Sequence, residues 1–303
     1  MSKVFNRKLW RRCIAVFMCA AAALSVTCRV KAAEPAELSA PRESAGQAED
    51  PAARSTKSSP AVYINGLEYT GKSFLYNSTT YVGIREYSMF MGAAGVDWNS
   101  AEKTAVVKSD ELTVSAKSGS TYVIANGRYL WAKDGIIIRD GTMYVPIRVI
   151  AKAFGCSVEW EQSTRTAYVS GGGRLLSGGE YYRSDEVLWL SRIINAEAGN
   201  EPLNGKIAVG TVVLNRVASS QFPNTIYSVI FDTNCGIQFT PAANGTIYNE
   251  PNAESVIAAK LCLDGASVSD KVLFFMNGRI AQSTWISDNR PYVMTIGNHD
   301  FFA

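Results

Sequence analysis

The sequence is nearly without histidine, since His299 is the only one in 303 residues. A single imidazole excludes the zinc sites with several histidines that many hydrolases use, and we expect no metal centre. Cysteine is also scarce: of six, three fall within the first 32 residues, which leaves too few for a disulfide scaffold. Cys235 and Cys262 are one pair that could form a bridge. A phosphate-binding loop and a dinucleotide fingerprint are absent too, so we expect no cofactor.

Residues 1–32 contain no acidic side chain and seven lysines and arginines. The first basic residues precede a short apolar run, 13–28, and a small-residue motif, 30–32, which is the order of a secretory signal peptide. The run is shorter than the ~20 apolar residues that a membrane-spanning helix needs, so an uncleaved anchor is the less favoured interpretation. Without this segment the formal charge changes from +3 to −4, and nothing calls for a nucleic-acid partner. We therefore expect a secreted protein of the cell envelope.

Residues 33–60 contain almost no large apolar residue and are rich in alanine, proline, glutamate and serine. Such a segment cannot bury a core, and we predict a flexible linker. The glycine-rich residues 171–180 predict a second linker. The chain is therefore expected to hold two domains, at 61–170 and 181–303.

The first of these domains repeats itself. The sequence YVGIREYSMFMGAAGVDWNSAEKTAVV (81–107) aligns with YVPIRVIAKAFGCSVEWEQSTRTAYV (144–169), at an offset of 63 residues that becomes 62 after a shared glycine. Asn65-Gly66 and Asn126-Gly127 each lie between β-branched or aromatic runs, which is typical of β-hairpins. Each copy predicts a hairpin, a strand, a short helix that ends at glycine, and a further strand. The pattern therefore indicates a β-rich module with two internal copies.

These two segments resemble the copper amine oxidase N-terminal domain family, over roughly 62–170. The region lacks histidine, so a copper site built from imidazoles is excluded. Arg85 and Arg148 occupy the same position in the two copies, and we favour a packing role for them over a ligand-binding role. The resemblance implies a surface-binding or spacer domain, whose partner would be a cell-surface polymer or protein.

The second domain opens with a stretch that predicts a helix, from an N-cap at Ser184 to a stop at Gly199. Leu190 and Ile193 belong to its apolar stripe, and Glu197 falls on the same stripe by helical spacing. A carboxyl group held against apolar surface keeps its proton, so its pKa rises toward the range of a general acid.

Helix geometry alone leaves an alternative equally open, in which Glu197 bends into water or pairs with Arg192 or Arg216. The next segment, 204–217, is apolar on nearly every face and predicts a central helix, so the helix of Glu197 leads directly into the core. Glu201 follows the helix stop, where capping or local support is the commoner use of an acid. We predict a supporting role for Glu201 rather than direct chemistry.

The second domain also resembles the cell wall hydrolase family of the spore cortex-lytic enzymes, over nearly all of 184–302. The segments that carry the resemblance are LSRIINAEAGNEPLNGKIAVGTVVLNRV, GIQFTPAANGTIYNE, FFMN and TIGNHDFF, in this order. It implies an α+β domain similar to lysozyme and the lytic transglycosylases, which cleaves peptidoglycan glycan strands between N-acetylmuramic acid and N-acetylglucosamine. The catalytic acid of the family matches Glu197. The family commonly has Arg-Gly before its second glutamate, whereas this chain has Gly199-Asn200, a departure that bears on Glu201 alone.

Several further side chains offer the amide groups and aromatic faces that sugars favour, although core packing or capping is the commoner role of each one singly. The predicted substrate-binding residues are Gln238, Phe239, Tyr248, Phe275, Asn277, Trp285 and His299. Three other functions stay open: a muramidase that uses water, a cell-wall peptidase that uses Cys235 with His299, and a wall-binding protein without catalysis.

Overall fold

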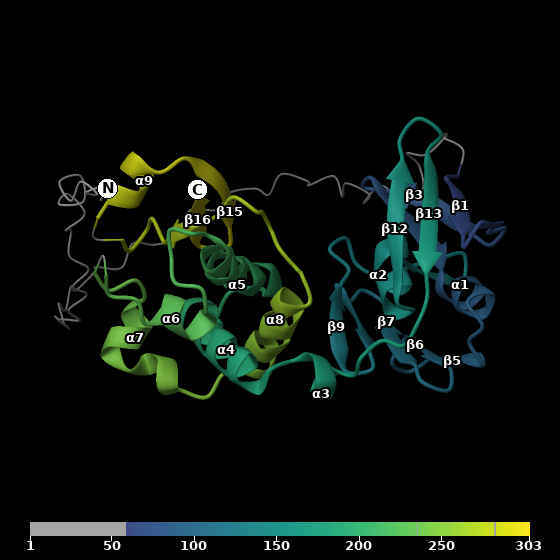
Figure 1. The fold of residues 1–303 in the computed structure, drawn as a ribbon, viewed down its shortest axis with the longest axis horizontal. Helices are drawn as coiled ribbons and strands as arrows, with labels where there is room; N and C mark the ends of the chain where they lie inside the picture. The colour runs from purple at the N-terminus through teal and green to yellow at the C-terminus, as the bar shows by residue number, and fades with distance from the viewer. Residues whose placement is uncertain (1–58, 235, 282) are drawn as a thin grey trace, which may run out of the picture. The chain divides into compact units, whose positions relative to one another are not determined.

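The computed structural model describes residues 59–234, 236–281 and 283–303 (Figure 1). The predicted signal segment, 1–32, and nearly all of the linker predicted at 33–60 lie outside these residues. Across the described ranges, no helix combines the length and the apolarity needed to cross a membrane.

The region up to residue 171 is built from strands and two short helices, as its β-rich sequence pattern predicts. The strands are β1 (Ala61–Ile64), β2 (Leu67–Glu68), β3 (Ser73–Tyr76), β4 (Thr79–Gly83), β5 (Gly95–Asn99), β6 (Thr104–Lys108), β7 (Thr113–Lys117), β8 (Tyr122–Ala125), β9 (Arg128–Trp131), β10 (Ile137–Arg139), β11 (Thr142–Pro146), β12 (Cys156–Glu161) and β13 (Thr166–Gly171), and the helices are α1 (Ile84–Phe90) and α2 (Ile147–Ala153). The strands form sheets with the orders β12-β13-β1-β2, β10-β11-β4-β3 and β5-β6-β7-β8-β9.

Both predicted Asn-Gly pairs form hairpin turns. Asn65 and Gly66 connect β1 to β2 with φ angles of 49° and 82°. Asn126 and Gly127 connect β8 to β9 with φ angles of 47° and 79°. Positive φ at both central residues is the property of a type I′ turn, whose twist matches that of the paired strands. The local sequence is therefore sufficient to fix these two hairpins.

A strand, a seven-residue helix and a hairpin follow one another twice in this region. β4, α1 and the hairpin of β5 with β6 form the first series, and β11, α2 and the hairpin of β12 with β13 form the second. Each helix is followed by a glycine with a left-handed φ, 82° at Gly92 and 71° at Gly155. β4 pairs with β11, where Val82 lies opposite Val145 and both side chains are buried.

The glycine-rich segment after β13 makes specific contacts. The backbone N–H of Gly178 donates to the carbonyl oxygen of Asn126 at 2.7 Å. Arg174 forms an ion pair with Glu180, and Glu180 also closes a capping box with Ser177 at the start of α3 (Gly178–Tyr181). The second half of the predicted linker, 171–180, is therefore held by hydrogen bonds to its surroundings.

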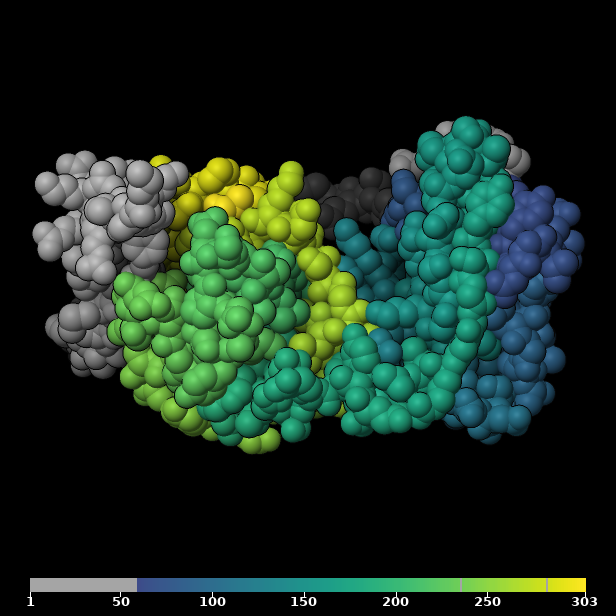
Figure 2. Space-filling view, in the orientation of Figure 1, coloured from purple at the N-terminus to yellow at the C-terminus, as the bar shows by residue number. Residues whose placement is uncertain are grey.

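Helices dominate the chain from residue 184 onward. The helices are α4 (Ser184–Ala198), α5 (Leu203–Ala218), α6 (Ile226–Ile230), α7 (Thr240–Asn244), the 3-10 helix η2 (Thr246–Tyr248), α8 (Ala253–Leu263) and α9 (Trp285–Asn289), and the strands β14 (Phe274–Met276), β15 (Tyr292–Ile296) and β16 (His299–Phe302) form a sheet with the order β14-β16-β15. α4, α5 and α8 pack against one another (Figure 1). In the space-filling view, the green segment that includes α6 and α7 lies on the visible face (Figure 2).

α5 is the central helix of this region, as predicted. Its residues 205–213 are buried. A Cβ atom at Gly210 would lie 2.7 Å from Cys262 Sγ on α8, so glycine allows the two helices to approach closely. Cys262 is a free, buried thiol, and burial raises the pKa of this thiol to about 12. Cys235, the other member of the pair considered from the sequence, lies outside the described residues, so a bridge between the two stays a prediction.

Asp264, directly after α8, has three polar partners. Its buried carboxylate accepts hydrogen bonds from the guanidinium of Arg128 on β9 and from the hydroxyl group of Tyr182. Lys152 of α2 forms an ion pair with the same carboxylate at 3.1 Å. A buried charge is tolerated when it is paired and hydrogen-bonded in this way.

Candidate active site

Helix α4 positions Glu197. The helix begins at Ser184, but the cap residue is Arg183, and the predicted capping role of Ser184 is wrong. The reason is backbone geometry: Arg183 is the last extended residue, so Ser184 already lies inside the first turn, where its side chain cannot cap. The C-cap is Gly199, as predicted, and Leu190 of the apolar stripe is fully buried. The stripe therefore directs Glu197 toward the interior.

Glu197 lies in the last turn of α4, partly withdrawn from solvent. Burial raises the pKa of the Glu197 carboxyl to about 7, because removal from water disfavours the ionised form. The guanidinium of Arg216 acts in the opposite direction and lowers this pKa. A carboxyl group with a pKa close to neutral can donate and accept a proton at the pH of most cellular reactions, which is the requirement for general acid–base catalysis.

Arg216, on α5, is the charged neighbour of Glu197 and is itself buried. Its Nε donates to the carbonyl oxygen of Leu273 at 2.8 Å, and its Nη1 donates to Gln238 Oε1 at 3.4 Å. The guanidinium carbon also lies 4.9, 5.2 and 5.3 Å from the ring centres of Phe222, Phe239 and Phe274. Burial lowers the pKa of Arg216 to about 10, while Asp232 and Glu197 raise it, so the side chain stays charged at neutral pH.

Arg216 is the residue that sequence reasoning does not single out, because the sequence offers it only as one of two possible ion-pair partners of Glu197, beside Arg192. Helical spacing in the sequence does indicate that Arg216 lies on the buried side of its helix. Arg216 follows Val209 by seven residues and Val213 by three, so it falls on a buried stripe of α5 just as Glu197 does on α4. α4 and α5 pack together, and the two helices bring opposite charges from their buried sides into one place.

Glu201 anchors the turn between β15 and β16. Its Oε1 accepts a hydrogen bond from Asn298 Nδ2 at 2.7 Å, and its Oε2 accepts one from the Asn298 backbone N–H at 3.2 Å. A Cβ atom at Gly297, where φ is +60°, would lie 1.8 Å from Glu201 Oε2, so only glycine fits there. The hydrogen bond from the Asn298 side chain is the main cause that lowers the pKa of Glu201. This geometry supports the predicted supporting role, which stays a prediction.

The predicted substrate-binding residues fall into two groups. In the first, Phe239, Phe275 and His299 pack together inside the domain. The ring centre of Phe275 lies 6.4 Å from that of Phe239 and 5.4 Å from that of His299. His299 is 7% exposed, and its Nδ1 lies 4.0 Å from Glu201 Oε1. Phe239 and His299 are buried and have little surface free for a sugar, whereas Phe275 is half-buried.

The second group lies closer to the surface. Gln238 accepts a hydrogen bond from Arg216 and so belongs to the surroundings of Glu197. Asn277 accepts a backbone hydrogen bond within its own turn, and Trp285 is the first residue of α9. Tyr248, at the end of η2, is 57% exposed. Within the ranges that the structure covers, no group of three or more His, Cys, Asp or Glu side chains is arranged to bind a metal ion.

Two family models match separate parts of the chain. Residues 200–302 match the Cell Wall Hydrolase family, and residues 63–169 match the Copper amine oxidase N-terminal domain. Both resemblances expected from the sequence are confirmed. The cell wall hydrolase match begins after Glu197, so it includes Glu201 and leaves the predicted catalytic acid to rest on the geometry given above.

The chain is also similar in sequence to spore cortex-lytic enzymes. The chain is 34% identical over 120 residues to the spore cortex-lytic enzyme of Bacillus subtilis, a match that covers 40% of this chain and 38% of that protein. It is 35% identical over 120 residues to the spore cortex-lytic enzyme of Bacillus cereus, with coverage of 40% and 45%. The chain thus spans less than half the length of these relatives. Among solved structures, it is 33% identical to the catalytic domain of the germination-specific lytic transglycosylase SleB from Bacillus anthracis, covering 43% of this chain and 100% of that one with a TM-score of 0.37.

Proposed function

We propose that this chain is a cell wall hydrolase that cleaves the glycan strand of peptidoglycan, between N-acetylmuramic acid and N-acetylglucosamine, as a lytic transglycosylase. One observation carries the proposal: Glu197 is a carboxyl group whose pKa is raised to about 7 beside the buried cation of Arg216. The match to the Cell Wall Hydrolase family and the names of the relatives support the substrate class. One acid of this kind is sufficient when the substrate supplies its own nucleophile.

The proposed reaction passes two protons through Glu197. First, the protonated carboxyl donates its proton to the glycosidic oxygen, and the bond between that oxygen and C1 of the muramic acid breaks with its electron pair on oxygen. Positive charge then develops at C1 in an oxocarbenium-like state. Second, the Glu197 carboxylate removes the proton of the 6-hydroxyl group on the same sugar, and this oxygen bonds to C1 to close a 1,6-anhydro ring. Glu197 is protonated again, and no second carboxylate is needed, unlike in the two-acid glycosidases.

Arg216 is proposed as a positioning residue for both proton transfers. Before the first transfer, its charge opposes the effect of burial and keeps the pKa of Glu197 from rising further. After that transfer, the same charge stabilises the carboxylate that has formed. Hydrogen bonds to Leu273 and Gln238 hold the guanidinium in place, so this stabilisation requires no rearrangement during the reaction.

Two other enzymatic activities are alternatives to the proposed one. A muramidase would use water as the nucleophile and leave a reducing end instead of an anhydro ring. A peptidase would use Cys235, which lies outside the described residues, as a nucleophile with His299 as its base. Since His299 is buried and its Nδ1 is directed toward Glu201, no observation favours the peptidase.

We also propose roles for the two segments that precede the candidate active site, and both roles suit a substrate in the cell envelope. Residues 63–169 are proposed to bind a cell-surface polymer or protein, with 81–107 and 144–169 as two copies of one unit. Residues 1–32 are proposed to direct secretion. A protein in which both regions only bind wall polymers is the non-catalytic alternative.

The test compares the wild-type protein with Glu197→Gln on purified peptidoglycan from spore cortex and from vegetative walls, with mass spectrometry of the released fragments. We expect anhydromuramic ends from the wild type and none from the variant. Reducing ends from the wild type would indicate the muramidase. Release that survives Glu197→Gln and is lost in Cys235→Ala would indicate the peptidase. Binding without release by either protein would favour the non-catalytic alternative.

A further inference from the structure

Four aromatic side chains converge on the first half of α4, away from Glu197. The ring centre of Trp189 lies 5.1 Å from that of Tyr227, 5.3 Å from that of Phe231 and 6.1 Å from that of Tyr248. Tyr227 lies on α6, Phe231 is the C-cap of that helix, and Tyr248 ends η2. We call these four side chains the Trp189 cluster. The predicted substrate-binding residue Tyr248 is therefore part of a group drawn from three segments.

The Trp189 cluster is open to solvent on one side, because Tyr227 is 51% and Tyr248 is 57% exposed. Arg192, one turn further along α4, places its guanidinium carbon 5.4 Å from the ring centre of Trp189. Its Nε is shielded from solvent and has no hydrogen-bond partner in the described part of the chain. Aromatic faces beside a guanidinium and two phenolic hydroxyl groups suit a sugar ring, which offers apolar C–H faces and hydroxyl groups.

Helix α4 and the segment after α6 both lead from the Trp189 cluster toward the surroundings of Glu197. Trp189 and Glu197 are eight residues apart on α4, which corresponds to ~12 Å along the helix axis. The segment after α6 provides a second connection: the ring of Phe231 contacts that of Trp189, and the charge of the next residue, Asp232, raises the pKa of Arg216. A glycan strand bound at Glu197 would therefore have to extend about 12 Å along α4 to reach Trp189.

We propose that the Trp189 cluster is a second saccharide subsite, which holds a more distant ring of the glycan strand whose bond lies at Glu197. This inference rests on the proposed function, since it takes the peptidoglycan glycan as the ligand. Only a strand long enough to reach both places gains from the cluster, so binding should become tighter as the strand lengthens.

The experiment measures binding without turnover. The full chain carrying Glu197→Gln is titrated in a calorimeter with peptide-free glycan strands of alternating N-acetylglucosamine and N-acetylmuramic acid, sorted by length. Tyr227→Ala and Tyr248→Ala are added singly to this variant. Tyr292→Ala is the matched control, because Tyr292 is 60% exposed, contacts one aromatic ring and lies on β15 outside the cluster.

Each cluster substitution should raise the Kd for long strands about tenfold, which equals about 1.4 kcal/mol and is the size expected for the loss of a half-buried aromatic face. The Kd for the disaccharide should change by less than about twofold, and Tyr292→Ala should change neither value. Unchanged affinity in both cluster variants, or an equal loss with Tyr292→Ala, overturns the proposal. Because the two tyrosines lie on different segments, misfolding of one variant, detected by circular dichroism, leaves the other as the test.

This titration and the product analysis of the wild type together separate the inference from the proposed function. If the wild type forms anhydro ends and the cluster variants bind long strands normally, the subsite is refuted and the reaction stands. If the wild type forms no anhydro ends and the cluster variants still lose affinity for long strands, the reaction is refuted and the subsite stands.

Discussion

Glu197→Gln should raise the free energy of unfolding at alkaline pH and leave it nearly unchanged at acid pH. Burial raises the pKa of Glu197 from an ordinary value of 4.5 to about 7 in the folded protein. Well below pH 4.5 the carboxyl is protonated in both the folded and the unfolded state, so its ionisation does not affect stability. As the pH rises toward 7, the unfolded chain releases the proton and the folded protein retains it, so the wild type loses stability.

The size of the effect follows from the change in pKa. A rise from 4.5 to about 7 corresponds to about 3 kcal/mol of destabilisation once the pH exceeds the folded-state value. Glutamine carries no charge and avoids this penalty, which already includes the attraction to Arg216 because the folded-state pKa reflects both influences. We therefore expect Glu197→Gln to exceed the wild type by about 3 kcal/mol at pH 8 and to match it within about 0.5 kcal/mol at pH 4.

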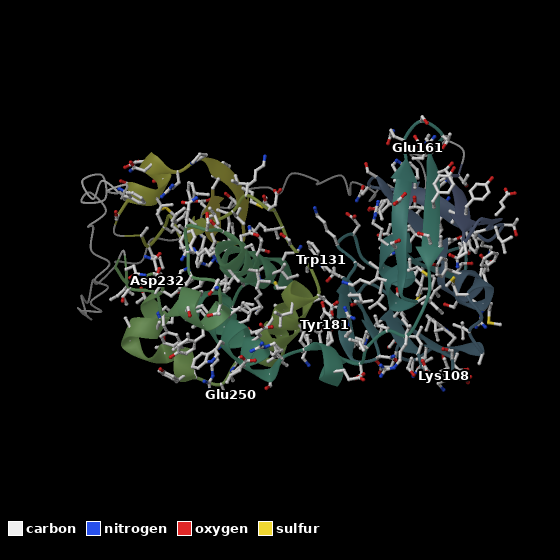
Figure 3. The ribbon with its side chains drawn as sticks, in the orientation of Figure 1. Lys108, Trp131, Glu161, Tyr181, Asp232 and Glu250 are labelled. Atoms are coloured by element: carbon white, nitrogen blue, oxygen red, sulfur yellow. The ribbon has the colours of Figure 1, made fainter. Side chains whose placement is uncertain are left out.

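The assay is urea unfolding of both proteins at pH 4, 6 and 8, with activity measured on the same samples. Glu250→Gln serves as the matched control, because it makes the same substitution at an exposed residue of the same region (Figure 3). Equal stability of Glu197→Gln and the wild type at pH 8 would refute the raised pKa of Glu197 in the folded protein. A gain of the same size at pH 4 and pH 8 would refute it as well, because that gain would not arise from ionisation.

Three further predictions concern other charged residues, Arg216, Glu201 and Asp264. Arg216→Met should move the alkaline limb of the kcat/KM profile to higher pH, because the guanidinium lowers the pKa of Glu197; a limb that stays in place would contradict this coupling. Glu201→Ala should lower the free energy of unfolding by about 2 kcal/mol in urea, because two hydrogen bonds from Asn298 are lost. Asp264→Ala should lower it by about 3–5 kcal/mol, because a buried guanidinium is left unpaired, and a loss below about 1 kcal/mol would show that this ion pair is solvated.

The features that the sequence predicts well are those set by local rules. Helical spacing places Glu197 on a buried stripe, and a pair such as Asn65 and Gly66 fixes a hairpin turn because few other residues tolerate its φ angles. The Ser184 cap is wrong by one residue, since a cap depends on where the extended backbone ends, and several residues near a helix start carry suitable side chains.

The features that the sequence does not predict are those that join distant segments. Asn298 reaches Glu201 across 97 positions, and Tyr248 meets Trp189 only when η2 packs on α4. His299 illustrates the consequence, because the residue type and the family motif suggest contact with substrate while the packing buries its ring against Phe275. Chemical type predicts what a side chain can do, and the tertiary contacts decide whether a substrate can reach it.

The proposed mechanism requires Glu197 to act as an acid and then as a base, and the two opposing influences on its pKa are both needed for this. At pH 7 a carboxyl group with the ordinary pKa is protonated in only about one molecule in three hundred, so few molecules could begin the reaction. Burial alone would raise the pKa until the carboxylate became too costly to form, and the second proton transfer would have no base. Arg216 limits that rise, and because it is buried itself, water does not screen its charge. A substitution that removes either influence should therefore impair one proton transfer more than the other, whereas a change that only weakens substrate binding should spare both.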